Sequence, residues 1–293
     1  MIDELETLRL LKREGSMTRA ATRLRITQST ASKRIQALEL KAKKKLVVPQ
    51  GRGVRLTPAG ERLLQRAVPL LGDLRAIFSE EAVEGEGRIS LALSESILGS
   101  WGAQLIVQAQ KAFPKIEFEL HAHRSLTVID RVRSGECLLG ICSGRAEEAP
   151  DLLVHELGEE KMVIVPSALD PQAIPSRGRV SVAGIELGSA TGAVLQRRLQ
   201  RRPQGSTGGM TIEVTQTLES YGCLVELAKQ GYFHAWVPRG IAKSFGIKPN
   251  QWISPKPSLT RPVSLIGRPS VLSLGHIQVV TQLLSRVSVG LLD

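Results

Sequence analysis

The residues whose spacing carries the clearest chemistry lie near the N-terminus. If residues 28–38 form a helix, Ala31, Ile35 and Leu38 share one face, because they stand at i, i+4 and i+7. A second face is polar. Ser29, Ser32, Lys33 and Gln36 stand on it at i, i+3, i+4 and i+7 and supply hydroxyl, ammonium and amide groups. A helix with an apolar back and such a polar front suits the major groove of DNA.

The net charge of the chain is concentrated at the same end. The 293 residues contain 39 Lys and Arg against 28 Asp and Glu, a net charge of +11. Residues 1–58 alone contain 14 basic and five acidic residues, a net charge of +9, so the remainder is close to neutral. A basic module attached to a nearly neutral globular body indicates binding to a polyanion.

Two further helices and a hairpin are expected to hold this helix in place. The first helix should run from about Asp3 to Arg13 and end at Gly15, with Ser16 or Thr18 capping the next one. Thr27 is the expected cap of the DNA-facing helix. Residues 47–57 carry glycines at their tip and predict a wing, or alternatively an ordinary surface hairpin.

The first 65 residues contain four segments typical of a winged helix-turn-helix, namely 15–21, 26–35, 38–39 and 51–60. Through them the chain resembles the winged helix-turn-helix of the LysR-type transcriptional regulators. The residues expected to contact DNA, with Arg52 in the wing, are Thr18, Arg19, Gln28, Ser29, Thr30, Ser32, Lys33, Arg34, Gln36 and Arg52. Around positions 42–49 this chain has extra lysines and lacks an arginine typical of the family, which predicts a steeper salt dependence of binding.

A long helix is expected directly after this module, at residues 58–85. Thr57 can cap it and Pro58 suits its first turn. Pro69 stands inside it and is expected to bend it. The resemblance implies dimerisation through an apolar stripe that contains Leu64, Ala67, Leu71, Leu74 and Phe78. The alternative is an amphipathic helix that packs on its own chain.

From residue 88 onward the pattern changes to alternating strands and helices, which predicts an α/β fold with a mainly parallel sheet. Two of the expected helices cover residues 96–112 and, ending at a glycine turn, residues 218–231. The resemblance implies two lobes like those of a periplasmic solute-binding protein, with a cleft between them. The expected boundaries are 1–60 for the winged module, 88–165 with 264–293 for lobe I, and 166–263 for lobe II.

Polar residues at the expected strand ends are candidates for binding an effector in that cleft, because backbone N–H groups converge where strands end and helices begin. They are Ser94, Ser96, Ser100, Arg124, Ser125, Ser143, Ser189, Thr191 and Thr217. Hydroxyls and amides without a matching carboxylate favour a small anion. For any one of these residues, helix capping or turn formation is the alternative role.

Other functions find less support in the sequence. We expect no enzyme activity, cofactor or metal site, because phosphate-binding and zinc-binding motifs are missing and His121 and His123 lack a third ligand. A thiol-redox sensor would need paired reactive cysteines, whereas Cys137 and Cys142 lie in an apolar strand. A non-specific architectural DNA-binding protein would not need the α/β body.

The expected surroundings follow from the same features. No apolar run reaches the roughly 18 residues that span a bilayer, and the first residues lack an export signal, so we expect a cytoplasmic protein without a membrane partner. The expected partners are double-stranded DNA, a small-molecule effector, further copies of the chain in a homodimer or homotetramer, and RNA polymerase. Together these expectations describe a ligand-controlled transcriptional regulator.

Overall fold

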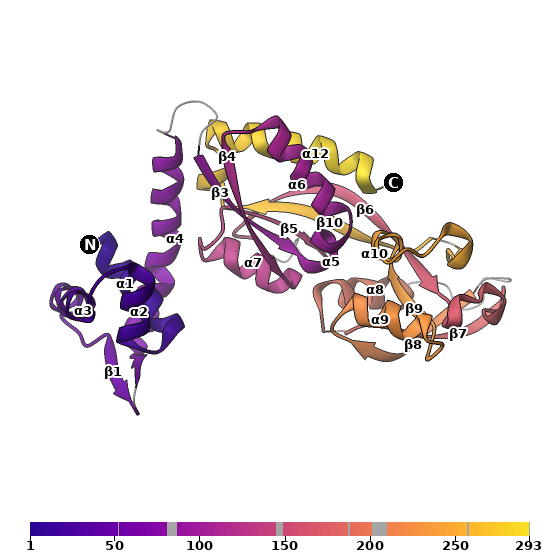
Figure 1. The fold of residues 1–293 in the computed structure, drawn as a ribbon, viewed down its shortest axis with the longest axis horizontal. Coiled ribbons are helices and arrows are strands. Elements are labelled where there is room, and N and C mark those ends of the chain that lie inside the picture. Colours follow the sequence, from indigo (N-terminus) through magenta and orange to yellow (C-terminus); the bar gives the residue numbers. More distant parts are fainter. Residues whose placement is uncertain are drawn as a thin grey trace. The chain divides into compact units, whose positions relative to one another are not determined.

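The computed structural model describes residues 1–51, 53–80, 87–144, 149–186, 188–200, 210–256 and 258–292, without the side chains of 75–80 and 200. The chain divides into an N-terminal module, residues 1–77, and an α/β domain made of most of the remaining residues (Figure 1). No helix among the described residues is both long and apolar enough to cross a membrane.

The N-terminal module is a winged helix-turn-helix, as the sequence predicts. Its elements are α1 (Ile2–Glu14), α2 (Met17–Leu24), α3 (Gln28–Ala42), β1 (Val47–Gln50) and β2 (Gly53–Leu56). The apolar face of α3 is buried through Ala31, Ile35 and Leu38, and the last two contribute to one core cluster with residues of α1. Because this face is covered, the opposite face of α3 is left toward solvent.

Local capping fixes where these helices begin and end. Gly15 ends α1 in the left-handed conformation with a φ of 61°, and its N–H donates to Leu11 O at 2.9 Å. Thr27 caps α3, because its Oγ1 accepts a hydrogen bond from Thr30 N at 3.1 Å. Ser16 stands at the corresponding position of α2, but its side chain makes no capping bond.

The hairpin β1–β2 is antiparallel and packs closely on the end of α1. Val47 faces Leu56 and Gln50 faces Gly53 in the register of the two strands. Val54 N donates to Gly15 O at 3.0 Å, and a Cβ on Gly53 would lie only 2.4 Å from the same oxygen. A side chain at position 53 would therefore push the wing away from α1. Arg52, predicted at the tip, lies outside the described residues.

Glu39 joins α3 to the start of the wing. Its carboxylate accepts hydrogen bonds from Leu46 N at 2.9 Å and Val47 N at 3.3 Å, and it pairs with Lys45 Nζ at 2.7 Å. Burial alone would raise the pKa of Glu39, but these donors outweigh it and lower the pKa below its ordinary value. The ionised carboxylate thus fixes the path of the chain between α3 and β1.

The long helix α4 covers Pro58–Glu80 and continues through Pro69. Thr57 caps it, with Gly60 N donating to Thr57 Oγ1 at 3.1 Å. Of the residues predicted for a dimerisation stripe, Leu64 belongs to the core cluster of the N-terminal module. Ala67 and Leu71 are also buried within the chain. Leu74 is 36% exposed, and the side chain of Phe78 lies outside the description.

The α/β domain has one eight-stranded sheet in the order β4-β3-β5-β10-β6-β9-β7-β8. The strands are β3 (Gly87–Ser94), β4 (Ile116–His123), β5 (Leu139–Ser143), β6 (Leu153–Val165), β7 (Gly178–Ile185), β8 (Met210–Leu218), β9 (Ala235–Pro238) and β10 (Thr260–Gly267). β3 pairs in parallel with β4 and β5, and β7 pairs in parallel with β8 and β9. The strands β6 and β10 run antiparallel to their neighbours.

Helices and short helical turns connect these strands. They are α5 (Glu95–Ile97), η1 (Leu98–Gly102), α6 (Ala103–Ala112), α7 (Ser125–Arg133), η3 (Ser167–Leu169), η4 (Pro171–Ala173), α8 (Ala190–Gln200), α9 (Tyr221–Lys229), α10 (Arg239–Ser244), η5 (Pro249–Gln251), α11 (Pro269–Leu272) and α12 (Gly275–Leu292). In lobe I, α6 and α12 lie on one side of the sheet and α7 lies on the other (Figure 1).

The two lobes are connected by a continuous strand, β6, that belongs to both of them. β6 pairs with β10 through Lys161 and with β9 from Met162 onward. Since β10 begins at Thr260, lobe II consists of residues 162–259, a few residues away from the predicted limits at both ends. The strand passes from one lobe to the other without a loop, because its hydrogen bonds simply change partner.

Some predicted elements of the α/β domain differ in the structure. The helix predicted for 96–112 is interrupted at Ser100, whose φ of −129° and ψ of −115° are not helical. The helix predicted for 218–231 begins only at Tyr221, because residues 210–218 form β8 and Ser220 caps the helix that follows. The predicted alternation therefore describes lobe I better than lobe II.

The Glu39 interactions predict a measurable stability effect. Glu39→Gln should lower the free energy of unfolding of the N-terminal module by about 2 kcal/mol, since a carboxylate holding two backbone N–H groups and an ammonium is lost. Because the folded pKa is lowered, this stabilisation should be present above the ordinary value of 4.5 and vanish as the pH falls through the folded pKa. Native-state hydrogen exchange over residues 1–60 measures it.

Glu61→Gln is the matched control for this experiment. Glu61 pairs with Lys12, and both side chains are about half exposed, at 48% and 55%. The control should change the free energy of unfolding by no more than about 0.5 kcal/mol. Equal effects of the two substitutions would contradict the special role of Glu39.

Candidate functional site

The polar face of α3 is open to solvent in the N-terminal module. Gln28, Ser29, Lys33 and Gln36 are exposed, and Ser32 is partly exposed between them. This is the face that the spacing of these residues predicts, and it is opposite the buried apolar face. The side chains offer hydroxyl, amide and ammonium groups along one side of a helix, which is the chemistry needed to contact base edges and phosphates.

Other residues predicted to contact DNA are held by neighbours within the module. Arg34 donates from Nη2 to Asp3 Oδ2 at 2.6 Å, and its side chain is only 25% exposed. Arg19 donates to the carbonyl oxygen of Glu14. Thr18 donates to Gln28 Oε1 at 3.2 Å, which joins α2 to the start of α3. Thr30 donates its N–H to the cap at Thr27.

A cavity of about 890 Å³ lies between the two lobes of the α/β domain. Its walls come from the carboxyl ends of strands in both lobes and from the first turns of the helices that follow them. Lobe I contributes the ends of β3, β4 and β5, and lobe II contributes the ends of β7 and β8. Three helices of at least nine residues, α7, α8 and α9, begin at the cavity and direct their positive ends toward it.

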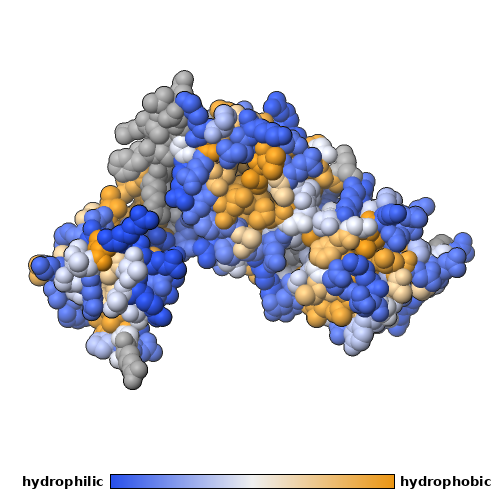
Figure 2. Space-filling view, viewed as in Figure 1, coloured by the Kyte–Doolittle hydropathy of each residue, from blue (hydrophilic) through white to orange (hydrophobic). Residues whose placement is uncertain are grey.

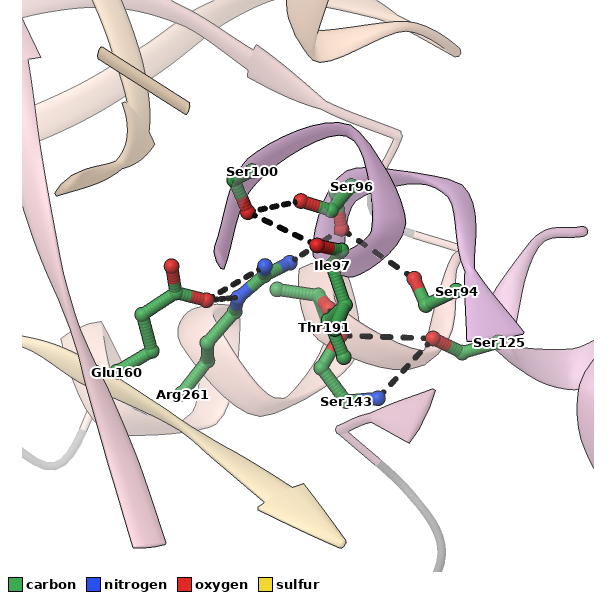
Figure 3. A network of polar contacts seen from close by, with 9 residues as sticks. All are labelled: Ser94, Ser96, Ile97, Ser100, Ser125, Ser143, Glu160, Thr191 and Arg261. Carbon is green, nitrogen blue, oxygen red and sulfur yellow. Dashed lines mark hydrogen bonds and ion pairs between the residues drawn. The ribbon is translucent and has the colours of Figure 1, made fainter. Parts of the chain in front are cut away.

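Buried and partly buried hydroxyls line one part of this cavity, and Figure 3 shows their hydrogen bonds. Ser143 Oγ lies 3.0 Å from Thr191 Oγ1, a contact that joins lobe I to lobe II. Ser143 N also donates to Ser125 Oγ at 3.2 Å. Ser94 Oγ lies 3.2 Å from Ser96 Oγ. We call these five residues the hydroxyl floor.

A fully buried ion pair lies beside the hydroxyl floor. Arg261 on β10 stands directly opposite Glu160 on β6, and the two side chains are 0% and 2% exposed. Glu160 Oε2 accepts from Arg261 Nε at 2.9 Å and Nη2 at 2.7 Å, while Arg261 Nη1 donates to Ser96 Oγ at 3.1 Å (Figure 3). Burial alone would lower the pKa of Arg261, but the carboxylate raises it, so the guanidinium stays charged.

An aromatic ring from lobe II completes the surroundings of Arg261. The guanidinium carbon of Arg261 lies 5.4 Å from the centre of the Tyr221 ring, a cation–π contact. Tyr221 lines the cavity and is 7% exposed, and its buried hydroxyl lies near Arg261 and Thr191. Burial raises the pKa of Tyr221, so the hydroxyl is neutral and can donate a hydrogen bond.

Charged side chains form the solvent-exposed rim of the cavity. Arg124 from lobe I reaches two carboxylates of lobe II, with Nη2 at 2.8 Å from Glu186 Oε2 and Nη1 at 3.3 Å from Glu219 Oε2. The three side chains are 42%, 38% and 69% exposed, respectively. Arg124 therefore bridges the lobes at the surface, while Ser143 and Thr191 connect them below.

Seven of the nine residues predicted to bind an effector line this cavity, and two do not. Ser100 lies on the other side of the interrupted helix, where its Oγ donates to Ser96 O at 2.7 Å and it lines a separate cavity. Thr217 is exposed on β8, one residue before the strand ends at Leu218, and does not line the cavity. Neither residue lines this cavity, because the chain bends at Ser100 within η1 and Thr217 still belongs to β8.

Sequence reasoning missed several residues of the cavity. Glu186, Glu219 and Tyr221 follow directly after β7 and β8, so correct prediction of these two strands would have identified them. Arg261 carries no such signal, because a buried arginine within a strand looks like a surface residue until its partner is known. The sequence analysis therefore predicted fewer charged side chains in the cavity than the structure places there.

Two of the three cysteines are buried away from solvent, and the third lies at the cavity. Cys137 and Cys142 are buried, and burial raises the pKa of the Cys142 thiol to about 12. A thiol of that kind stays protonated and unreactive at neutral pH. Cys223 is exposed and lines the cavity. Among the residues that the structure describes, no group of three or more His, Cys, Asp or Glu could hold a metal ion.

Comparisons with known proteins match both parts of the chain. Residues 2–61 match the model for the bacterial regulatory helix-turn-helix protein, lysR family, and residues 82–286 match the model for the LysR substrate binding domain. An uncharacterised HTH-type transcriptional regulator from Vibrio cholerae is 29% identical over 273 residues, which cover 92% of this chain and 90% of the relative.

Two full-length solved structures share the fold. A variant of OxyR from Pseudomonas aeruginosa has a TM-score of 0.72 at 18% identity, and the match covers 99% of this chain and 97% of that one. CbnR in complex with its target DNA has a TM-score of 0.64 at 16% identity, with 98% of this chain and 99% of that one covered.

The buried ion pair predicts a specific pattern of stabilities. Arg261→Met and Glu160→Met should each lower the free energy of unfolding of the α/β domain by about 3–5 kcal/mol, because each leaves one charge buried without its partner. The double variant should recover most of that loss, since no buried charge remains. Denaturation followed by tryptophan fluorescence measures this, because Trp101, Trp236 and Trp252 all lie in this domain.

An exposed pair provides the control. Arg179 lies 3.5 Å from Glu213, with exposures of 73% and 46%, so Arg179→Met should have an effect close to zero. If the double variant were as unstable as the single ones, the loss would come from packing and not from charge.

Proposed function

The chain belongs to the LysR family of bacterial regulatory helix-turn-helix proteins, and from this premise we propose that α3 binds operator DNA while the cavity binds a small anionic effector. The observation that carries the proposal is the coexistence in one chain of an exposed polar face on α3 and a polar cavity between two lobes. The family membership makes it a transcriptional regulator with an effector-binding domain.

DNA binding is proposed to use the exposed face of α3 in the major groove. Lys33 and Gln36 would contact phosphates or base edges. Ser29 and Ser32 would contact the phosphate or the base edge that lies nearest to each. The net charge of +9 over residues 1–58 adds attraction that does not depend on sequence. Arg34 joins this surface only if it leaves Asp3, so its contribution is proposed to be conditional on DNA.

The effector is proposed to place an anionic group, such as a carboxylate, on the hydroxyl floor. Ser96, Ser143 and Thr191 can donate hydrogen bonds there, and the first turns of α7, α8 and α9 supply positive helix ends. Ser189 supports this arrangement, because its Oγ accepts from Gly192 N at 3.0 Å and so defines the start of α8.

Effector binding is proposed to change how the lobes close. The lobes are joined through β6 and the start of β10, so a ligand that contacts both lobes stabilises one closure state by its difference in affinity for the two states. The change would alter the spacing of paired DNA-binding modules on their half-sites, and through it DNA bending and access of RNA polymerase.

Self-association is proposed as a homodimer or homotetramer. Exposed apolar side chains lie on α4 (Leu70, 63% exposed, and Leu74), on α6 (Val107) and on the edge strand β4 (Leu120). Figure 2 shows hydrophobic areas on the surface of the α/β domain as well as hydrophilic ones. Exposed apolar side chains grouped on a helix and an edge strand favour contact with another chain.

No enzymatic role is proposed. Among the described residues that line the cavity, hydroxyls lie within hydrogen-bond distance of one another, and no hydrogen bond joins a nucleophile to a base. The proposed place of action is the cytoplasm, where bacterial DNA is located.

The role of α3 is tested by substitutions on its exposed face. Lys33→Ala should weaken binding of the full chain to an operator selected from genomic fragments by about tenfold. It should also reduce the slope of log affinity against log salt by about one, because one phosphate contact is lost. Ser32→Ala should weaken specific binding while leaving the salt slope unchanged. Binding isotherms at several salt concentrations measure both effects.

Lys256→Ala is the control of matched charge, because Lys256 is exposed in the α/β domain. It should leave the affinity and the salt slope unchanged. Operator binding that is insensitive to both Ser32→Ala and Lys33→Ala would remove α3 as the DNA-contacting element.

The role of the hydroxyl floor is tested by removing one hydroxyl. Small carboxylates that raise the melting temperature of the full chain should bind Thr191→Val at least tenfold more weakly, because Thr191 is the hydroxyl that joins the two lobes. Titration calorimetry measures the affinities. Ser273→Ala, which changes an exposed serine outside the cavity, is the control. Equal affinities for both variants would show that the ligand binds elsewhere.

A further inference from the structure

The rim and the floor of the cavity have opposite electrostatic character. The described residues that line it include the four carboxylates of Glu95, Glu186, Glu219 and Glu226. Two arginines, Arg124 and Arg261, also line it. Arg261 is paired with Glu160, which is buried and does not line the cavity, so its positive charge does not offset the carboxylates of the rim.

The pairing of the remaining charges leaves an excess of carboxylate at the rim. Arg124 is shared by Glu186 and Glu219, and Glu226 pairs with Lys229 at 2.9 Å. One guanidinium therefore serves two carboxylates. Two carboxylates that share one cation keep a net negative charge, which attracts a second cation.

The floor lacks carboxylates and is bordered by positive helix ends. Ser94, Ser125, Ser143 and Thr191 are at most 9% exposed. The hydroxyl of Tyr221, which lines the same cavity and is itself 7% exposed, is a neutral hydrogen-bond donor beside Thr191. An anionic group is favoured at the floor for the same reason that a cationic group is favoured at the rim.

The Arg124 bridge is weak enough for a ligand to displace. Its three side chains are between 38% and 69% exposed, so water screens their attraction. Ion pairs of this exposure contribute little to the stability of a protein. A cationic group that enters the cavity and reaches both carboxylates can replace the guanidinium at little cost.

We propose that the effector is an aminocarboxylate, a molecule with a carboxylate at one end and a protonated amine at the other. The carboxylate lies on the hydroxyl floor, and the ammonium group binds Glu186 and Glu219 in place of Arg124. This inference rests on the proposed effector function and assigns a second recognition element to the same cavity. Release of Arg124 breaks its ion pairs with Glu186 and Glu219, which bridge the lobes at the surface. The bound ligand then connects the two lobes in their place.

The first test compares ligands that differ only in the amine. The full chain is screened by thermal shift with the twenty L-amino acids and with unbranched ω-aminocarboxylates of two to six carbons. A parallel set contains monocarboxylates and dicarboxylates of the same lengths. At least one amine-bearing compound should raise the melting temperature, and its amine-free counterpart should not. Glu186→Gln with Glu219→Gln should weaken binding of that compound at least tenfold.

The second test uses the sign of the effect of Arg124. Arg124→Gln should strengthen binding of the amine-bearing compound several-fold, because the guanidinium no longer competes for the two carboxylates. In a cavity that binds only anions, the same substitution would weaken binding, because a cation is lost. Arg179→Gln and Glu213→Gln change an exposed ion pair outside the cavity and should leave the affinity unchanged.

The outcomes separate this inference from the effector function itself. Binding of amine-free carboxylates alone, or weaker binding by Arg124→Gln, overturns the aminocarboxylate assignment and leaves the cavity as an effector site. If neither set binds, both the assignment and the proposed effector function are overturned, while the result for DNA binding by α3 is unaffected.

Discussion

The α/β domain depends on one buried ion pair, that of Glu160 and Arg261. The two residues stand opposite each other on β6 and β10, the strands that connect the lobes. Because a buried charge cannot lose its partner without a large penalty, the register of these strands is fixed. Arg261 also donates to Ser96 in lobe I and lies against the ring of Tyr221 in lobe II. The strand ends of both lobes are thereby held around one cavity.

The properties of the cavity follow from this arrangement. Parallel strands in each lobe end at the same place, and helices that start there turn their positive ends inward. The buried hydroxyls near these helix starts form a floor suited to an anion. The carboxylates after β7 and β8 stand further out, where water and Arg124 surround them. Depth within the cavity therefore separates the two kinds of charge.

Much of the N-terminal module was predictable because its determinants are local. The spacing of Ala31, Ile35 and Leu38 fixes which face of α3 is buried, and Thr27 and Gly15 fix helix ends through bonds to residues three or four positions away. The role of Leu64 was not predictable in the same way. Its spacing is equally suited to a dimer seam and to the core of its own module, and only the contacts with α1 decide between them.

The amino-acid sequence by itself determined the winged module, the capped start of the long helix, the alternating α/β character of the body and the hydroxyl-bearing strand ends. These depend on periodicity and on interactions over a few residues. Only the tertiary structure decided that Arg261 faces Glu160 across 101 positions, that Arg124 is shared by Glu186 and Glu219, and that Arg34 is held by Asp3. Charged side chains carry no periodic signal, and the partner of each is set by how distant segments pair.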